Sequence, residues 1–72
     1  MKKIMKIEGM SCNHCKATVE KTLGALPGTT AVVILDDNAA YITTDGQVSD
    51  QQLIDAIVDD TPFTVLGLEN QP

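Results

Sequence analysis

The spacing of apolar residues along this chain changes several times between every second position, as in a strand, and every third or fourth position, as in a helix. These changes constrain the fold more than any other feature. Residues 2–8 alternate apolar with charged side chains, which predicts a strand with Met5 and Ile7 turned inward. From residue 13 onward, apolar residues recur every three or four positions, which predicts a helix. The expected buried stripe of this helix is Cys15, Val19, Leu23 and Leu26. Gly24 weakens the end of the helix, and Pro27 with Gly28 stops it.

A hairpin is predicted next. Residues 31–35 and 39–44 have strand composition, and Asp36-Asp37-Asn38 between them is typical of a turn. The first of these strands is apolar at successive positions, so either face would suit the core. We expect the inward set to be Val32, Ile34, Ala40 and Ile42.

A second helix and a last strand complete the pattern. Ser49 and Gln52 fit a capping box, in which each satisfies a backbone amide of the other at a helix start. The helix is predicted to run to about residue 58. Its expected apolar stripe is Leu53, Ile54, Ile57 and Val58. Pro62 prevents continuation, residues 63–68 are predicted as the last strand, and residues 69–72 as a frayed end.

The order strand, helix, strand, strand, helix, strand predicts an α+β fold. It matches the ferredoxin-like βαββαβ sandwich, an antiparallel four-stranded sheet with two helices on one face. With 72 residues, we expect a single domain covering 1–72. The first and last strands are neighbours in this topology, so residues 59–63 should lie beside Cys12 and Cys15.

Charge and hydropathy exclude several function classes. The net charge is −5, all five basic residues lie in the first 21 positions, and no base follows them. Nucleic-acid binding requires clustered Lys and Arg, so no nucleic acid is expected as a partner. No run approaches the roughly 18 apolar residues of a membrane span, which argues against direct membrane insertion. The N-terminal residues lack a signal-peptide pattern, so we expect a cytoplasmic protein.

Both cysteines lie in one short segment at the start of the first predicted helix. Cys15 falls in the first helical turn, where unpaired amides and the helix dipole favour a thiolate, and Cys12 precedes it by three positions. Two thiolates at this spacing can bind one soft ion such as Cu(I) or Zn(II). A structural zinc site needs four protein ligands, whereas the candidates here are Cys12, Cys15 and the auxiliary His14. We therefore predict an open site, from which a partner's thiolate can take the ion.

Residues 9–15, Gly-Met-Ser-Cys-Asn-His-Cys, resemble the glycine-methionine-x-cysteine-x-x-cysteine motif of heavy-metal-associated domains, especially the small bacterial copper chaperones. The resemblance covers essentially the whole chain, including Pro27-Gly28 after the first helix and Phe63 near the last strand. It implies that Cys12 and Cys15 bind Cu(I) and that Met10 anchors the loop without being a ligand.

The resemblance also implies partners and a route for the metal. Members of the family pass copper to a metal-binding domain of a copper-transporting P-type ATPase or to a copper-responsive repressor. We expect a monomer, with a metal-bridged homodimer as the alternative. Many relatives have a Gly-Tyr pair before the last strand, whereas this chain has Asp59, Asp60 and then Phe63. Oxygen ligands there would favour Zn(II) or Cd(II), so a carrier of Zn(II), Cd(II) or Hg(II) is one alternative.

Two further alternatives follow from the two cysteines. A thiol oxidoreductase would use them as a redox pair, although Asn13-His14 lies between them and the chain has no Trp. A regulatory interaction module would use the metal only to control docking. His14 is expected to face solvent, and Asp59 with Asp60 to keep the protein in solution. No nucleophile, base and orienting group are recognisable together, so an enzyme is not expected.

Overall fold

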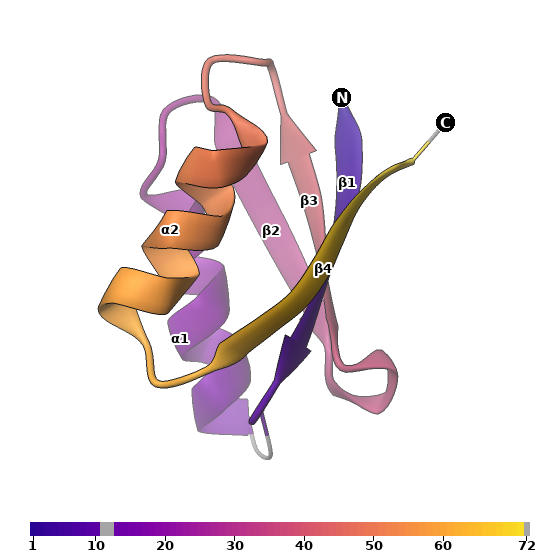
Figure 1. Cartoon of the computed structure of the whole chain (residues 1–72), viewed down its shortest axis with the longest axis vertical. Helices are drawn as coiled ribbons and strands as arrows, with labels where there is room; N and C mark the ends of the chain where they lie inside the picture. The colour runs from indigo at the N-terminus through magenta and orange to yellow at the C-terminus, as the bar shows by residue number, and fades with distance from the viewer. Residues whose placement is uncertain (11–12, 72) are drawn as a thin grey trace.

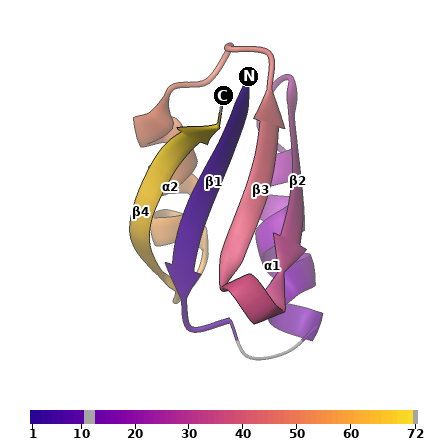
Figure 2. The ribbon, with the colours of Figure 1, turned by 90° about the vertical axis from the view of Figure 1, so that its right-hand side faces the viewer.

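One open antiparallel sheet organises the part of the chain that the computed structural model describes, residues 1–10 and 13–71. Its strands lie in the order β2-β3-β1-β4. Their bounds are β1 Lys2–Glu8, β2 Thr29–Ile34, β3 Ala39–Thr44 and β4 Thr64–Gln71, and the helices are α1 Asn13–Gly24 and α2 Asp50–Asp60. Both helices lie on the same side of the sheet (Figures 1 and 2), which confirms the predicted α+β arrangement.

The core lies between the sheet and the two helices. Met5 and Ile7 of β1 are completely buried, as their alternation predicts. The other completely or almost completely buried apolar side chains of the core cluster are Val19, Leu23, Val33, Ala40, Ile42, Leu53 and Ile57. Cys15 and Leu26, the remaining members of the predicted stripe, are half-buried against this core. No helix in the described residues is long and apolar enough to cross a membrane.

The predicted inward face of β2 is wrong, although that of β3 is right. Val33 is completely buried, whereas Val32 and Ile34 are 55% and 40% exposed. The register pairs Val33 with Ala40, and residues directly opposite one another share a face of the sheet. Burial of Ala40 under the helices therefore turns Val33 inward.

The start of α2 matches its prediction, and its end does not. The Gln52 N–H donates to Ser49 Oγ at 3.2 Å, and the Ser49 N–H donates to Gln52 Oε1 at 2.8 Å, so the capping box is present. The helix continues to Asp60, and Val58 is 55% exposed instead of joining the stripe. Val58 is rotated by about 100° from Ile57 around the helix, which turns it off the side that faces the sheet.

The last strand is longer than predicted. β4 extends to Gln71 and pairs with β1 as far as Lys2, so the predicted fraying of residues 69–71 is wrong. A further contact was not predicted. The Lys3 side chain, only 6% exposed, forms an ion pair with Asp50 at 2.5 Å and donates to Asn70 Oδ1 at 2.6 Å. It joins β1 to the start of α2 and the end of β4.

Gly28 occupies a turn position that accepts no side chain without cost. Its φ is +62°, and a Cβ atom there would overlap the carboxylate of Asp45. That carboxylate accepts hydrogen bonds from the Gln47 side chain at 2.7 Å and the Gln47 N–H at 3.1 Å, which lower the pKa of Asp45. The Asp45 N–H in turn donates to Gly28 O at 3.1 Å. The turn before β2 and the turn after β3 are thus held against each other.

We expect Gly28→Ala to lower the free energy of unfolding by about 2 kcal/mol, mainly from left-handed backbone strain. The matched control is Gly24→Ala at the end of α1, where no atom lies within 4 Å of an added Cβ. This control should raise stability by about 0.5–1 kcal/mol, because alanine favours the helix. Urea unfolding of both variants measures the difference. Changes of the same sign would contradict the assigned turn.

Candidate metal-binding loop

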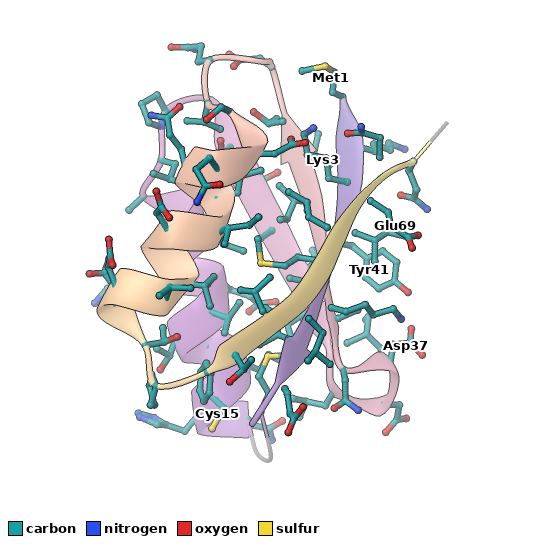
Figure 3. The ribbon with its side chains drawn as sticks, in the orientation of Figure 1. Met1, Lys3, Cys15, Asp37, Tyr41 and Glu69 are labelled. Carbon is teal, nitrogen blue, oxygen red and sulfur yellow. The ribbon has the colours of Figure 1, made fainter. Side chains whose placement is uncertain are left out.

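Cys15 lies at the start of α1, as predicted. The helix begins at Asn13, so Cys15 is in its first turn, and no acidic residue is present in that turn. The side chain is half-buried and packs against the core from one end of the molecule (Figure 3). A sulfur in this position is close to the helix N-terminus, which favours a thiolate.

The second predicted ligand, Cys12, lies outside the described residues together with Ser11. The relative placement of the two sulfur atoms therefore stays a prediction. Met10, immediately before them, is 6% exposed and belongs to the core cluster. This burial agrees with the expected anchoring role of Met10, because a packed side chain fixes the point from which the loop leaves β1.

The end of α2 and the start of β4 lie beside the end of β1. Glu8 pairs with Thr64, and a Cβ atom on Gly9 would lie 3.2 Å from Cδ1 of Phe63. Gly9 has a φ of +107°, a conformation that side chains rarely adopt, so its glycine suits both the backbone and the close Phe63 ring. The loops after β1 and before β4 therefore lie side by side at Gly9 and Phe63, whereas the predicted closeness of residues 59–63 to Cys12 and Cys15 stays a prediction.

Thr61 is a residue of this region that the sequence analysis missed. It is buried, its hydroxyl donates to Ile57 O at 2.6 Å, and the Phe63 N–H donates to that hydroxyl at 3.3 Å. The hydroxyl ends α2 and positions Phe63 beside Gly9. The available signal was a threonine directly before Pro62, where a helix must stop.

We expect Thr61→Val to remove the protection of the Phe63 amide and to cost about 1–2 kcal/mol, because a partly buried N–H loses its acceptor. Thr61→Ser is the matched control, since it keeps the hydroxyl. Hydrogen exchange followed residue by residue distinguishes the two variants. Loss of Phe63 protection in Thr61→Ser but not in Thr61→Val would show that side-chain volume, and not the hydrogen bond, is what matters, because valine keeps the volume of threonine.

The other residues that the sequence suggested for this site are more exposed to solvent than Cys15. His14, Asp59 and Asp60 are exposed. Among residues 1–10 and 13–71, no three His, Cys, Asp or Glu side chains gather into one metal-binding group. Lys16, next to Cys15, is half-buried. Lys16 therefore places a positive charge in the first turn of α1, the turn that contains Cys15.

Fold and loop together define a class: a small α+β sandwich with a cysteine in the first turn of its first helix. The model of the heavy-metal-associated domain matches residues 4–64, and the chain belongs to this family. The resemblance noted from residues 9–15 is thereby confirmed.

Several of the individual proteins that this chain resembles within the family are copper proteins. A copper chaperone CopZ from Staphylococcus haemolyticus is 44% identical over 59 residues, covering 79% of this chain and 87% of that protein. One from Staphylococcus aureus is 38% identical over 58 residues, covering 78% and 85%. Among solved structures, a CopZ metallochaperone superposes with a TM-score of 0.86 at 35% identity, covering 92% of this chain and all of the other. A copper-binding domain from a P-type ATPase superposes with a TM-score of 0.80 at 28% identity, covering 97% and 100%.

Proposed function

We propose that this protein is a cytoplasmic copper chaperone that binds one Cu(I) through Cys12 and Cys15 and transfers it to a partner protein. The observation that carries the proposal is Cys15 in the first turn of α1, in a chain 44% identical to a copper chaperone. The Cys15 side chain is half-buried and packs against the core, so it is held in place and is still partly exposed to solvent. These are the properties that a carrier needs.

The proposed transfer is a stepwise thiolate exchange. Cu(I) is stable with two or three sulfur ligands, so a thiolate of the partner forms a third bond to the ion before a bond to this chain breaks. The copper stays Cu(I), and no electron is transferred. The helix N-terminus supports the thiolate of Cys15 throughout, so the leaving sulfur remains an anion and needs no proton. Lys16, next to Cys15 on α1, offsets part of the negative charge of the complex.

The proposed receivers are proteins with a similar thiol site. A copper-binding domain from a P-type ATPase shares this fold with a TM-score of 0.80, which supports a domain of that kind as receiver. A copper-responsive repressor is the second receiver that the resemblance implies. In the absence of a receiver, two copies of this chain could share one copper through four thiolates.

Anaerobic titration with Cu(I) against a chromophoric chelator tests the metal. We expect one Cu(I) per chain, bound tightly enough to compete with the chelator, and undisturbed by a tenfold excess of Zn(II), because soft thiolates prefer Cu(I). Mixing the loaded protein with an ATPase metal-binding domain then tests transfer, which should reach equilibrium within the mixing time and be reversible. Preferential Zn(II) binding would favour the zinc-carrier alternative. Turnover of a Cys12–Cys15 disulfide with glutathione would favour the redox alternative.

A further inference from the structure

The strand β2 forms one edge of the sheet, next to β3 and with α1 behind it (Figure 2). Its sequence, Thr-Thr-Ala-Val-Val-Ile, contains three β-branched apolar residues and no charge, proline or glycine. Segments of this composition pair readily with strands of other chains, and an edge strand presents unpaired N–H and C=O groups for such pairing. The β2 edge is therefore a place where a second chain could add to the sheet.

The two edges of the sheet differ in how they are protected. The register of β4 with β1 shifts between Lys6 and Ile7, and β4 contains Gly67 and Glu69. An irregular register and a charge both discourage the addition of another strand. The register of β2 with β3 is continuous along the whole of β2, which carries no charge. Protection of the β2 edge therefore has to come from another element.

Glu20 of α1 contacts the β2 edge. The Val33 N–H donates to Glu20 Oε2 at 2.9 Å in a partly buried hydrogen bond. An N–H that reaches α1 in this way points away from β3, and alternation along an antiparallel strand turns the Ala31 N–H toward the same edge. The carboxylate of Glu20 thus occupies a donor that an incoming strand would use, and it places a negative charge beside an apolar edge.

The body of α1 does not close the end of the β2 edge. An open cavity of about 200 Å³ lies between the start of α1 and the end of β2. It is lined by Asn13, Lys16, Val33, Ile34, Leu35 and Asp36. Because space remains beside this end of β2, the hydrogen bond from Val33 to Glu20 protects the edge where the bulk of the helix does not.

We propose that Glu20 is a guard residue of the β2 edge: by accepting the Val33 N–H, it prevents antiparallel pairing of β2 with β2 of a second copy. Two β2 strands suit one another, because neither carries a charge and both present the same alternating N–H and C=O groups, which a two-fold axis matches. This role is separate from the proposed copper function, since Glu20 lies beyond the first turn of α1, which contains Cys15.

Substitutions at Glu20 separate the hydrogen bond from the charge. Glu20→Ala removes the acceptor and retains α1, because alanine is the best helix former. Glu20→Gln removes the charge and keeps an oxygen acceptor of the same reach. Glu69→Ala, at an exposed position of β4, removes the same side chain and the same charge away from β2. If circular dichroism shows that Glu20→Ala is unfolded, Glu20→Met, which keeps the side-chain length without an oxygen, carries the same expectation.

Amide hydrogen exchange and sedimentation equilibrium are measured together from about 10 μM to about 1 mM, with reductant and a metal chelator present. In dilute Glu20→Ala, the Val33 amide should exchange at least about tenfold faster than in the unaltered chain, because it has lost its acceptor. In concentrated Glu20→Ala, the chains should associate, and the Ala31 and Val33 amides should gain protection from the added strand. The unaltered chain, Glu20→Gln and Glu69→Ala should remain monomeric throughout.

A second substitution locates the contact on β2. In the Glu20→Ala background, Val32→Lys places a charge at an exposed position of the edge strand, which opposes strand pairing. The added lysine also makes this acidic chain less negative, so general repulsion between copies decreases. We nevertheless expect association at least about tenfold weaker than in Glu20→Ala alone, since like charges on paired strands are destabilising.

Four outcomes would overturn the proposal. A Glu20→Ala chain that loses Val33 protection and stays monomeric would show that the uncovered edge does not pair. Unchanged Val33 protection in Glu20→Ala would show that this hydrogen bond is not the guard. Equal association of Glu20→Ala and Glu69→Ala would leave only the charge as the cause, and association that Val32→Lys does not weaken would place the contact elsewhere. The copper stoichiometry of Glu20→Ala, measured separately, reports on the proposed copper function alone.

Discussion

Cys15→Ser should abolish tight Cu(I) binding and leave the fold intact. A serine hydroxyl is a hard, protonated ligand at neutral pH, so the variant would retain a single thiolate for a soft ion. We expect affinity to fall by more than about a hundredfold, beyond the ten- to hundredfold typical of residues that only orient a ligand. Competition with a Cu(I) chelator under anaerobic conditions measures this loss.

The matched control for Cys15→Ser is Ala17→Ser, which adds a hydroxyl at an exposed position of the same helix. Its Cu(I) affinity should remain within about threefold of the unaltered protein, less than 1 kcal/mol. The double replacement of Cys12 and Cys15 by serine should remove binding and still give the circular dichroism spectrum of the folded chain. Tight Cu(I) binding in the double variant would refute the assignment of the ligands.

Ile57→Ala should be among the most destabilising single substitutions in α2. The side chain is completely buried against the sheet, so its truncation removes apolar contacts and leaves a cavity. Such a change typically costs about 2–5 kcal/mol. A domain of 72 residues has little stability to spare, and at about 4–8 °C per kcal/mol the melting temperature should fall by about 8–40 °C.

Val58→Ala on the next residue is the internal comparison. Because Val58 is 55% exposed, its truncation should change the free energy of unfolding by no more than about 0.5 kcal/mol, and the better helix propensity of alanine acts in the opposite direction. Urea unfolding of the two variants side by side gives the difference. Similar losses at both positions would mean that α2 is rotated relative to the sheet.

Much of the candidate site was predictable from local sequence. The cysteine spacing, the preceding Gly9-Met10 and the start of a helical period at Asn13 together place Cys15 in a first helical turn. Thr61 was not predictable in its role, because its hydroxyl acts on Ile57 and Phe63 through the geometry of a helix end. The closeness of Gly9 and Phe63 could not be predicted from local sequence, because it depends on β1 and β4 being neighbours in the sheet.

The amino-acid sequence by itself determined the order of the elements, the caps and breaks between them, and the inward faces of β1 and β3. These follow from local rules: alternation in a strand, a helical period, a capping box, and proline or glycine at an end. Only the tertiary structure decided which valine of β2 is buried, that Val58 lies outside the core, that β4 reaches Gln71, and that Lys3 is buried with Asp50 and Asn70. The physical reason is that each of these depends on a partner distant in sequence. A strand that is apolar on both sides takes its orientation from the neighbour it pairs with, and a lysine among apolar neighbours is buried only where a carboxylate and an amide are positioned to meet it.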